Sequence, residues 1–97
     1  IVKPTIVIWI PDAFTPNGDG LNETFGPSGV GIGDENYKMY IYNRWGELIF
    51  LSEKFDDRWD GKINGIEVPS NVFVYRILFT DSFGYEYERV GRVTLLR

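Results

Sequence analysis

Apolar residues recur along the chain in short runs that are separated by Gly, Asn, Asp and Pro about every ten residues. In residues 37–43 the pattern alternates, with Met39 and Ile41 on one side and Lys38 on the other. A turn at 43–46 then leads into a second apolar run at 47–51. A period of two is typical of a half-buried strand, so these runs predict a β-hairpin. Residues 5–10 predict an earlier strand that ends at Pro11, and residues 1–9 could equally be a linker from an upstream domain.

Residues 72–79 are almost continuously apolar, which fits a helix or a buried strand. Their β-branched and aromatic side chains, and the turns on both sides, favour a central strand. Residues 85–89 alternate and continue into a last strand at 90–96, where Gly91 indicates a bulge or kink. Residues 67–69 fit a short edge strand. With hardly any helix signal, the pattern predicts an all-β antiparallel sandwich of six to eight strands.

The composition narrows the classes of function. The chain has 97 residues, of which 43% are hydrophobic and 16% aromatic, enough for one domain with its own core. Histidine and cysteine are absent, which removes the commonest general base, the commonest zinc ligand and the usual nucleophilic pairs. The net charge of −4, without a basic stripe, argues against nucleic acid as a partner. An enzyme is therefore the least favoured class.

One segment has the residue types of a calcium loop. Asn17, Asp19, Asn22 and Glu23 fall within seven residues, with glycines between them. Calcium takes six to eight oxygen ligands, so a site here would need a further acid from elsewhere, such as Asp12 or Asp60. The spacing is not that of an EF-hand. The alternative is a tight loop whose Asn and Asp side chains accept hydrogen bonds from their own backbone.

A second acidic segment, DDRWDG at residues 56–61, places three carboxylates within five residues. Two carboxylates that face each other across a sugar would indicate a glycosidase, but neighbouring acids on one loop rarely face each other. We favour a structural interpretation, in which Trp59 fills the core and Asp60 holds a turn before Gly61.

The aromatic residues are too numerous for a core of this size. Exposed rings could stack on sugars, anchor a partner protein, or simply pair across strands. The last interpretation is slightly favoured. The residues concerned are Trp9, Tyr37, Tyr40, Tyr42, Trp45, Tyr85 and Tyr87.

Four stretches in order match one family: IPDAFTPNGDGLNETF, YIYNRWGELIF, WDGKINGIEVPSNVFVYRI and, at the end, GRVTLLR. From about residue 10 to 97 the chain resembles the gliding-motility-associated C-terminal domain, the type B sorting domain of the type IX secretion system of Bacteroidota. The resemblance implies an immunoglobulin-like β-sandwich without catalytic activity. It also implies a position behind cargo domains that pass from the periplasm across the outer membrane to the cell surface or medium. Its partners would be the secretion machinery and an associated outer-membrane protein.

A sorting domain must present a surface after it has folded, and the last strand, residues 90–97, is the best candidate. An exposed edge there could pair with a strand of a partner, although alternate residues would also close the core. The predicted recognition residues are Gly91, Val93, Leu95, Leu96 and Arg97. The 17–23 loop resembles calcium-holding loops of other bacterial immunoglobulin-like modules. A calcium-dependent carbohydrate-binding or adhesion module is therefore the alternative function.

Overall fold

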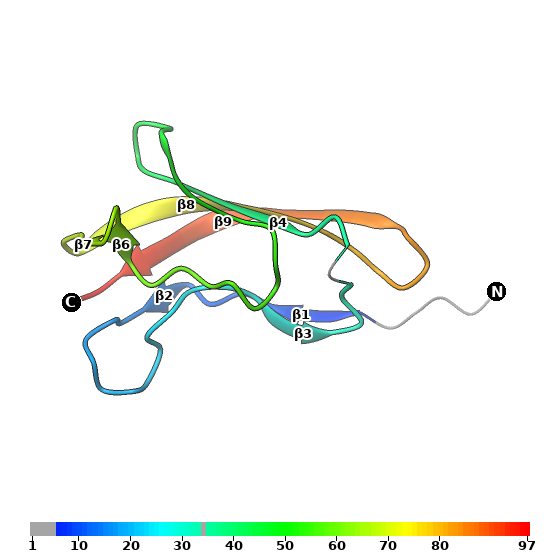
Figure 1. Cartoon of the computed structure of the whole chain (residues 1–97), viewed down its shortest axis with the longest axis horizontal. Coiled ribbons are helices and arrows are strands. Elements are labelled where there is room, and N and C mark those ends of the chain that lie inside the picture. Colours follow the sequence, from blue (N-terminus) through cyan, green and yellow to red (C-terminus); the bar gives the residue numbers. More distant parts are fainter. Residues whose placement is uncertain (1–5, 34) are drawn as a thin grey trace.

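The computed structural model describes residues 6–33 and 35–97, and this part of the chain is built from strands, turns and loops (Figure 1). It contains no helix that is long and apolar enough to cross a membrane. Nine strands are described, and five of them have only two or three residues. They are β1 (Val7–Trp9), β2 (Ala13–Phe14), β3 (Ser28–Val30), β4 (Lys38–Tyr42), β5 (Leu48–Ser52), β6 (Lys62–Ile63), β7 (Ile66–Glu67), β8 (Asn71–Thr80) and β9 (Glu86–Leu95).

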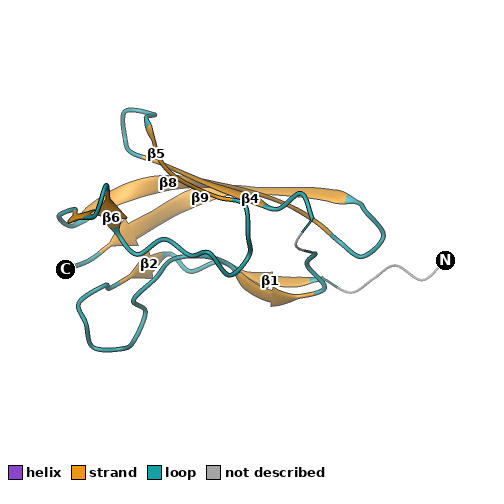
Figure 2. Ribbon diagram, viewed as in Figure 1, coloured by secondary structure: helices purple, strands orange, loops and turns teal. Residues whose placement is uncertain are grey.

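The strands form two layers and a separate small hairpin (Figure 2). The larger layer is a five-stranded sheet in the order β2-β9-β8-β4-β5, and β1 and β3 form a two-stranded sheet across from it. The hairpin β6–β7 lies at the end where β9 finishes. The predicted all-β sandwich is therefore confirmed. The immunoglobulin-like detail is not, because the described smaller layer has two strands where that fold has three or more.

The pairing departs from the predicted antiparallel arrangement at one place. β2 runs parallel to β9, with Ala13 opposite Thr94 and Phe14 opposite Leu95, while the other neighbouring strands are antiparallel. The chain leaves β1 in one layer, turns after Pro11, and joins the edge of the other layer in the same direction as β9. A proline has no amide hydrogen to donate to a ladder, which favours this change of layer at Pro11.

The core lies between the two layers, and aromatic rings fill much of it. Trp59 is fully buried, and its ring centroid lies 4.9 Å from that of Phe73 and 5.4 Å from that of Phe14. The alternating residues Met39 and Ile41 both point inward, as predicted. The fully or almost fully buried apolar residues are Phe14, Phe25, Tyr37, Met39, Ile41, Trp59, Phe73, Ile77, Phe79, Val93 and Leu95.

Most of the longer predicted strands are confirmed. The hairpin β4–β5 is present, and the apolar run at 72–79 is the central strand β8, paired with β4 and β9. The predicted last strand, formed by residues 85–89 and 90–96, is confirmed as β9 except for its two end residues. Of the predicted edge strand at 67–69, only Glu67 lies in a strand, which is β7. Of the predicted first strand, Val7–Trp9 form β1, and residues 1–5 lie outside the described part.

Gly91 corrects one prediction. Its register with β8 is continuous, so the strand has no bulge at the glycine. Gly91 lies opposite Tyr75, and a Cβ atom at this position would come within 2.4 Å of the Tyr75 hydroxyl oxygen. The glycine is required because the tyrosine side chain crosses over the backbone there.

Candidate functional site

Segments that are far apart in the sequence meet at one end of the sandwich, which we call the Arg97 end. It comprises the loop at residues 15–24, the hairpin β6–β7 and the last residues of the sequence (Figure 1). The pairing explains the meeting: β9 finishes at Leu95, directly beside Phe14 at the end of β2 and Asn71 at the start of β8. The β4–β5 turn at 43–47 projects from the same end of the sheet.

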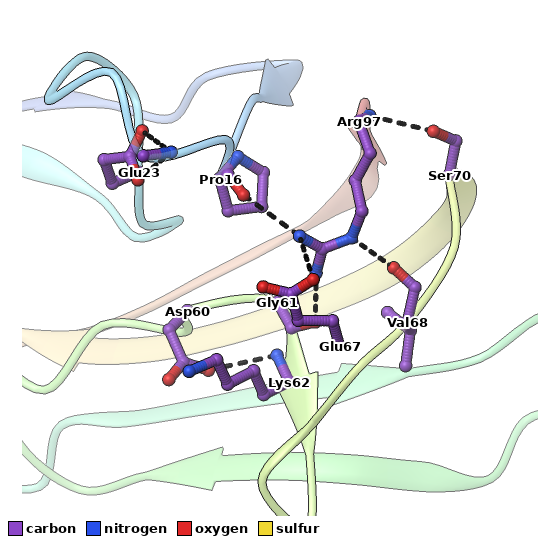
Figure 3. A network of polar contacts seen from close by, with 10 residues as sticks. Pro16, Glu23, Asp60, Gly61, Lys62, Glu67, Val68, Ser70 and Arg97 are labelled. Atoms are coloured by element: carbon purple, nitrogen blue, oxygen red, sulfur yellow. Dashed lines mark hydrogen bonds and ion pairs between the residues drawn. The ribbon is translucent and has the colours of Figure 1, made fainter.

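The guanidinium of Arg97 ties three of these segments together. It donates hydrogen bonds to the carbonyl oxygens of Pro16 at 3.0 Å and Gly61 at 2.9 Å, and also to that of Val68. Figure 3 shows the side chain lying between Pro16 on one side and the two hairpin-flanking residues on the other.

Two further contacts fix the end of the chain. The Arg97 amide donates to the Ser70 hydroxyl oxygen at 2.8 Å, which holds the backbone beside the start of β8. The Glu67 carboxylate lies 3.8 Å from the guanidinium, in an ion pair whose glutamate is mostly exposed. An exposed pair of this kind contributes little stability. The carbonyl contacts are therefore the main restraint on the side chain.

A hollow of about 500 Å³ opens beside Arg97, between the 15–24 loop and the β6–β7 hairpin. Two cationic side chains and three carboxylates border it, so its rim carries both signs of charge. The lining residues are Pro16, Asn17, Gly18, Glu23, Thr24, Asp60, Lys62, Glu67 and Arg97. A surface of this composition suits a polar partner surface or peptide, because it offers both hydrogen-bond donors and acceptors.

The turn at 59–62 shapes one wall of the hollow. Asp60 accepts a hydrogen bond from the Lys62 amide at 3.0 Å, and the Trp59 indole donates to the Lys62 carbonyl oxygen at 3.0 Å. The structural interpretation of DDRWDG is therefore confirmed. Gly61 has a φ of 81°, and a Cβ atom there would meet Leu95, Pro16 and Arg97 at 3.0–3.2 Å. Only glycine fits at this turn without displacing them.

The opposite wall is the loop with the predicted calcium ligands, whose side chains bond to the loop's own amides. Glu23 accepts hydrogen bonds from the amides of Gly18 at 2.9 Å and Asp19 at 3.2 Å. Asn17 accepts from the Asp19 amide at 3.1 Å, and Asp19 from the Leu21 amide at 2.8 Å. The Leu21 bond, with help from neighbouring side chains, holds the pKa of Asp19 below its ordinary value.

These hydrogen bonds bear on the fit of the loop to calcium. Asn22, the fourth predicted ligand, has a left-handed backbone with a φ of 52°. Within residues 6–33 and 35–97, no three His, Cys, Asp or Glu side chains are grouped so that they could hold a metal ion. A cation in the loop would have to compete with amide donors for the same oxygen atoms. Calcium binding by Asn17, Asp19, Asn22 and Glu23 stays a prediction.

The predicted recognition residues differ in accessibility. Val93 and Leu95 are fully buried, so a partner cannot reach their side chains in the folded domain. Gly91 is half-buried opposite Tyr75. Leu96 is 46% exposed. The Arg97 side chain is 21% exposed, because its guanidinium faces the carbonyl oxygens described above.

Sequence reasoning missed several contributors to the Arg97 end. Lys62 follows the DDRWDG segment and was given no role, and Glu67 lies in a segment that was interpreted as an edge strand. The carbonyl groups of Pro16 and Val68 carry no side-chain signal. The one signal for a role of Lys62 was that it belongs to WDGK, within the third family-like stretch.

The exposed rings of Trp9, Trp45 and Tyr85 lie on three different elements. Trp9 is on β1, Trp45 is in the β4–β5 turn, and Tyr85 is in the β8–β9 turn at the far end of the sheet. Tyr40 and Tyr42 are half-buried and stack on each other with ring centroids 6.2 Å apart.

Comparison with known families agrees with the ordered sequence stretches. The family model described as the CHU_C type IX secretion signal domain matches residues 8–95, which is nearly the whole chain. No curated protein matches the chain. The family match favours a sorting signal over a sugar-binding or adhesion module, and this family is not a family of enzymes. The chain therefore belongs to the CHU_C type IX secretion signal domain family.

Proposed function

We propose that the Arg97 end is the surface by which the type IX secretion machinery recognises this signal domain. Family membership supplies the general role: the domain marks the protein that carries it for type IX export toward the cell surface or medium. The location of the recognised surface within the domain is our proposal.

One observation carries the proposal, and it is the convergence of the family-like stretches. The first contributes the 15–24 loop, the third contributes the 59–62 turn and the β6–β7 hairpin, and the last contributes Arg97. The second contributes the turn at 43–47, at the same end of the sheet. A pattern of buried residues would be enough to specify the fold. These stretches also place polar side chains around one hollow.

In this proposal the domain stands behind its cargo domains and acts as an address, not as a catalyst. The cargo crosses the periplasm with the domain folded, and an outer-membrane protein of the secretion apparatus binds the Arg97 end. A hollow with both signs of charge on its rim supports recognition by a polar, hydrogen-bonding partner surface.

The test exchanges charges on the rim of the hollow. In a cargo protein exported by its own cell, Lys62→Glu and Glu67→Lys are introduced together, so the net charge of the domain does not change. Both side chains line the hollow and neither belongs to the buried core. We expect the exported fraction to fall severalfold while the amount made in the cell and the melting temperature of the purified protein stay the same.

A matched control makes the same exchange at the other end of the sheet. Lys38→Glu with Glu86→Lys alters two exposed residues that lie opposite Leu78 and Thr80, far from Arg97 in the pairing. We expect normal export from this control. Equal export by the two exchanged proteins would contradict the proposal.

A further inference from the structure

We infer that Arg97 is a positioning residue of the signal: its side chain holds the two walls of the hollow at a fixed separation. The machinery then contacts the assembled hollow rather than the charge of Arg97. This inference rests on the proposed function, because it assumes that the Arg97 end is the surface that is recognised.

The first support is the direction in which the guanidinium points. Three of its N–H groups are directed at backbone carbonyl oxygens, and the side chain is only 21% exposed. The acceptors belong to residues that lie 81, 36 and 29 positions away in the sequence. A cation meant for direct contact with a partner would instead present free donors to solvent.

The second support is that these contacts join the two walls of the hollow near its rim. At the base of the two walls, Phe25 and Trp59 exchange backbone hydrogen bonds of 2.8 and 2.9 Å. Nearer the rim, the guanidinium of Arg97 joins Pro16 on one wall to Gly61 on the other. Apart from the Arg97 guanidinium, no group in the described part of the chain joins Pro16 to the hairpin by hydrogen bonds.

The third support is the chemistry of the side chain. Arginine presents five N–H donors in a planar fork, which can reach acceptors in several directions at once. Lysine carries the same charge on a single ammonium group and cannot bridge carbonyl groups on two walls in the same way. Arg97→Lys therefore separates the positioning role from the charge.

The experiment uses the full-length cargo protein in its secreting cell, with the variants Arg97→Lys and Arg97→Gln. Arg89→Gln is the control, because Arg89 is an exposed arginine of β9 that lies opposite Ile77, away from the Arg97 end. We expect both Arg97 variants to be exported poorly and Arg89→Gln to be exported normally. In the purified variants, the amides of Gly18 and Asp19 should exchange hydrogen about tenfold faster, while those of β8 and β9 stay protected.

A second pair of variants displaces Arg97 without replacing it. Gly61→Ala puts a Cβ atom 3.2 Å from the guanidinium, 3.1 Å from Pro16 and 3.0 Å from the Leu95 side chain, so its melting temperature is measured beside its export. Gly65→Ala is the matched control, because Gly65 has nearly the same backbone, with a φ of 78°, and nothing within 4 Å of its Cβ position. We expect Gly61→Ala to lose export and Gly65→Ala to keep most of it.

The outcomes separate this inference from the proposed function. Normal export of Arg97→Lys together with failure of Arg97→Gln would show that the charge itself is recognised, and the positioning role would be wrong. Normal export of Arg97→Gln and Gly61→Ala would also overturn it, even if the charge exchange at Lys62 and Glu67 abolishes export. If that exchange leaves export normal, the proposed function itself fails.

Discussion

At the scale of single residues, Gly91 is the clearest case of sequence constrained by a neighbour. The Tyr75 ring that crosses it also packs on Phe25, with ring centroids 5.4 Å apart, so the ring has little freedom to move. We expect Gly91→Ala to lower the free energy of unfolding by about 1–3 kcal/mol, which is typical of overpacking. Denaturant unfolding of the purified domain measures this loss.

The companion variant Tyr75→Leu tests the cause. Removing the ring and its hydroxyl should reduce the penalty of Gly91→Ala in the double variant, because the clash is between these two residues. An equal penalty with and without Tyr75 would assign the effect to the strand backbone instead.

Asp81 makes the stability of the β8–β9 turn depend on pH. Its carboxylate accepts hydrogen bonds from the amides of Phe83 at 2.8 Å and Tyr85 at 3.1 Å. The Tyr87 hydroxyl also donates to it, at 2.9 Å. Burial disfavours the charge, but these bonds outweigh it and hold the pKa of Asp81 below its ordinary value of 3.8.

A lowered pKa in the folded state gives stability that is complete above pH 3.8 and is lost as the pH falls through the folded pKa. We therefore expect the free energy of unfolding to fall as the pH drops below 3.8, and to fall less in Asp81→Asn. Denaturant unfolding at stepped pH checks this. Identical slopes for the two proteins would mean that Asp81 does not contribute.

The 17–23 loop gives a prediction about calcium. If the predicted ligands bind calcium, the melting temperature should be higher in calcium at about 10 mM, above the range in which extracellular calcium modules bind, than in chelator, and Glu23→Gln should lose this difference. The same melting temperature in both would contradict the site, and the amide hydrogen bonds that Glu23 accepts would then be its whole role.

At the scale of elements, the last strand contributes to the folded structure, on which any recognition of the domain depends. Deleting residues 90–97 would remove six of the ten residues of β9 that pair with β8, together with buried Val93 and Leu95. We expect the shortened domain to be unfolded, with its near-ultraviolet circular dichroism lost. A folded shortened domain would contradict this. Loss of export on this deletion therefore cannot by itself locate the recognised surface.

Element prediction succeeded where a pattern was long enough to have a period. The alternation at Met39 and Ile41 and the long apolar run of β8 were sufficient. β2, β3 and β6 have two or three residues each, which is too short for any periodicity. Their existence depends on partners elsewhere in the chain, as Ala13 depends on Thr94.

At the scale of the whole molecule, the sequence does not predict which distant residues lie next to one another. It singled out Asn17, Glu23 and Arg97 for separate reasons, and the structure places all three around one hollow. Their meeting depends on the parallel pairing of β2 with β9, which no local pattern predicts. The same pairing brings in Pro16, whose carbonyl oxygen no sequence signal distinguishes.

Because the hollow is assembled from distant segments, a linear piece of the chain should not act as a signal. We expect a reporter fused to residues 86–97 alone to remain inside the cell, and a reporter fused to the whole domain to be exported. Immunoblots of cell and medium fractions measure the difference. Export of the short fusion would show that a linear segment is sufficient.

The buried indole of Trp59 gives this domain a natural optical probe. Trp9 and Trp45 are largely exposed, so they emit at the long wavelengths of water-surrounded indoles, whereas Trp59 emits at shorter wavelengths from an apolar site. Because Trp59 bonds to the Lys62 carbonyl oxygen beneath the hollow, loosening of that wall shifts its emission to the red. Whether this wall of the hollow is intact can therefore be followed by fluorescence in real time, without any added label.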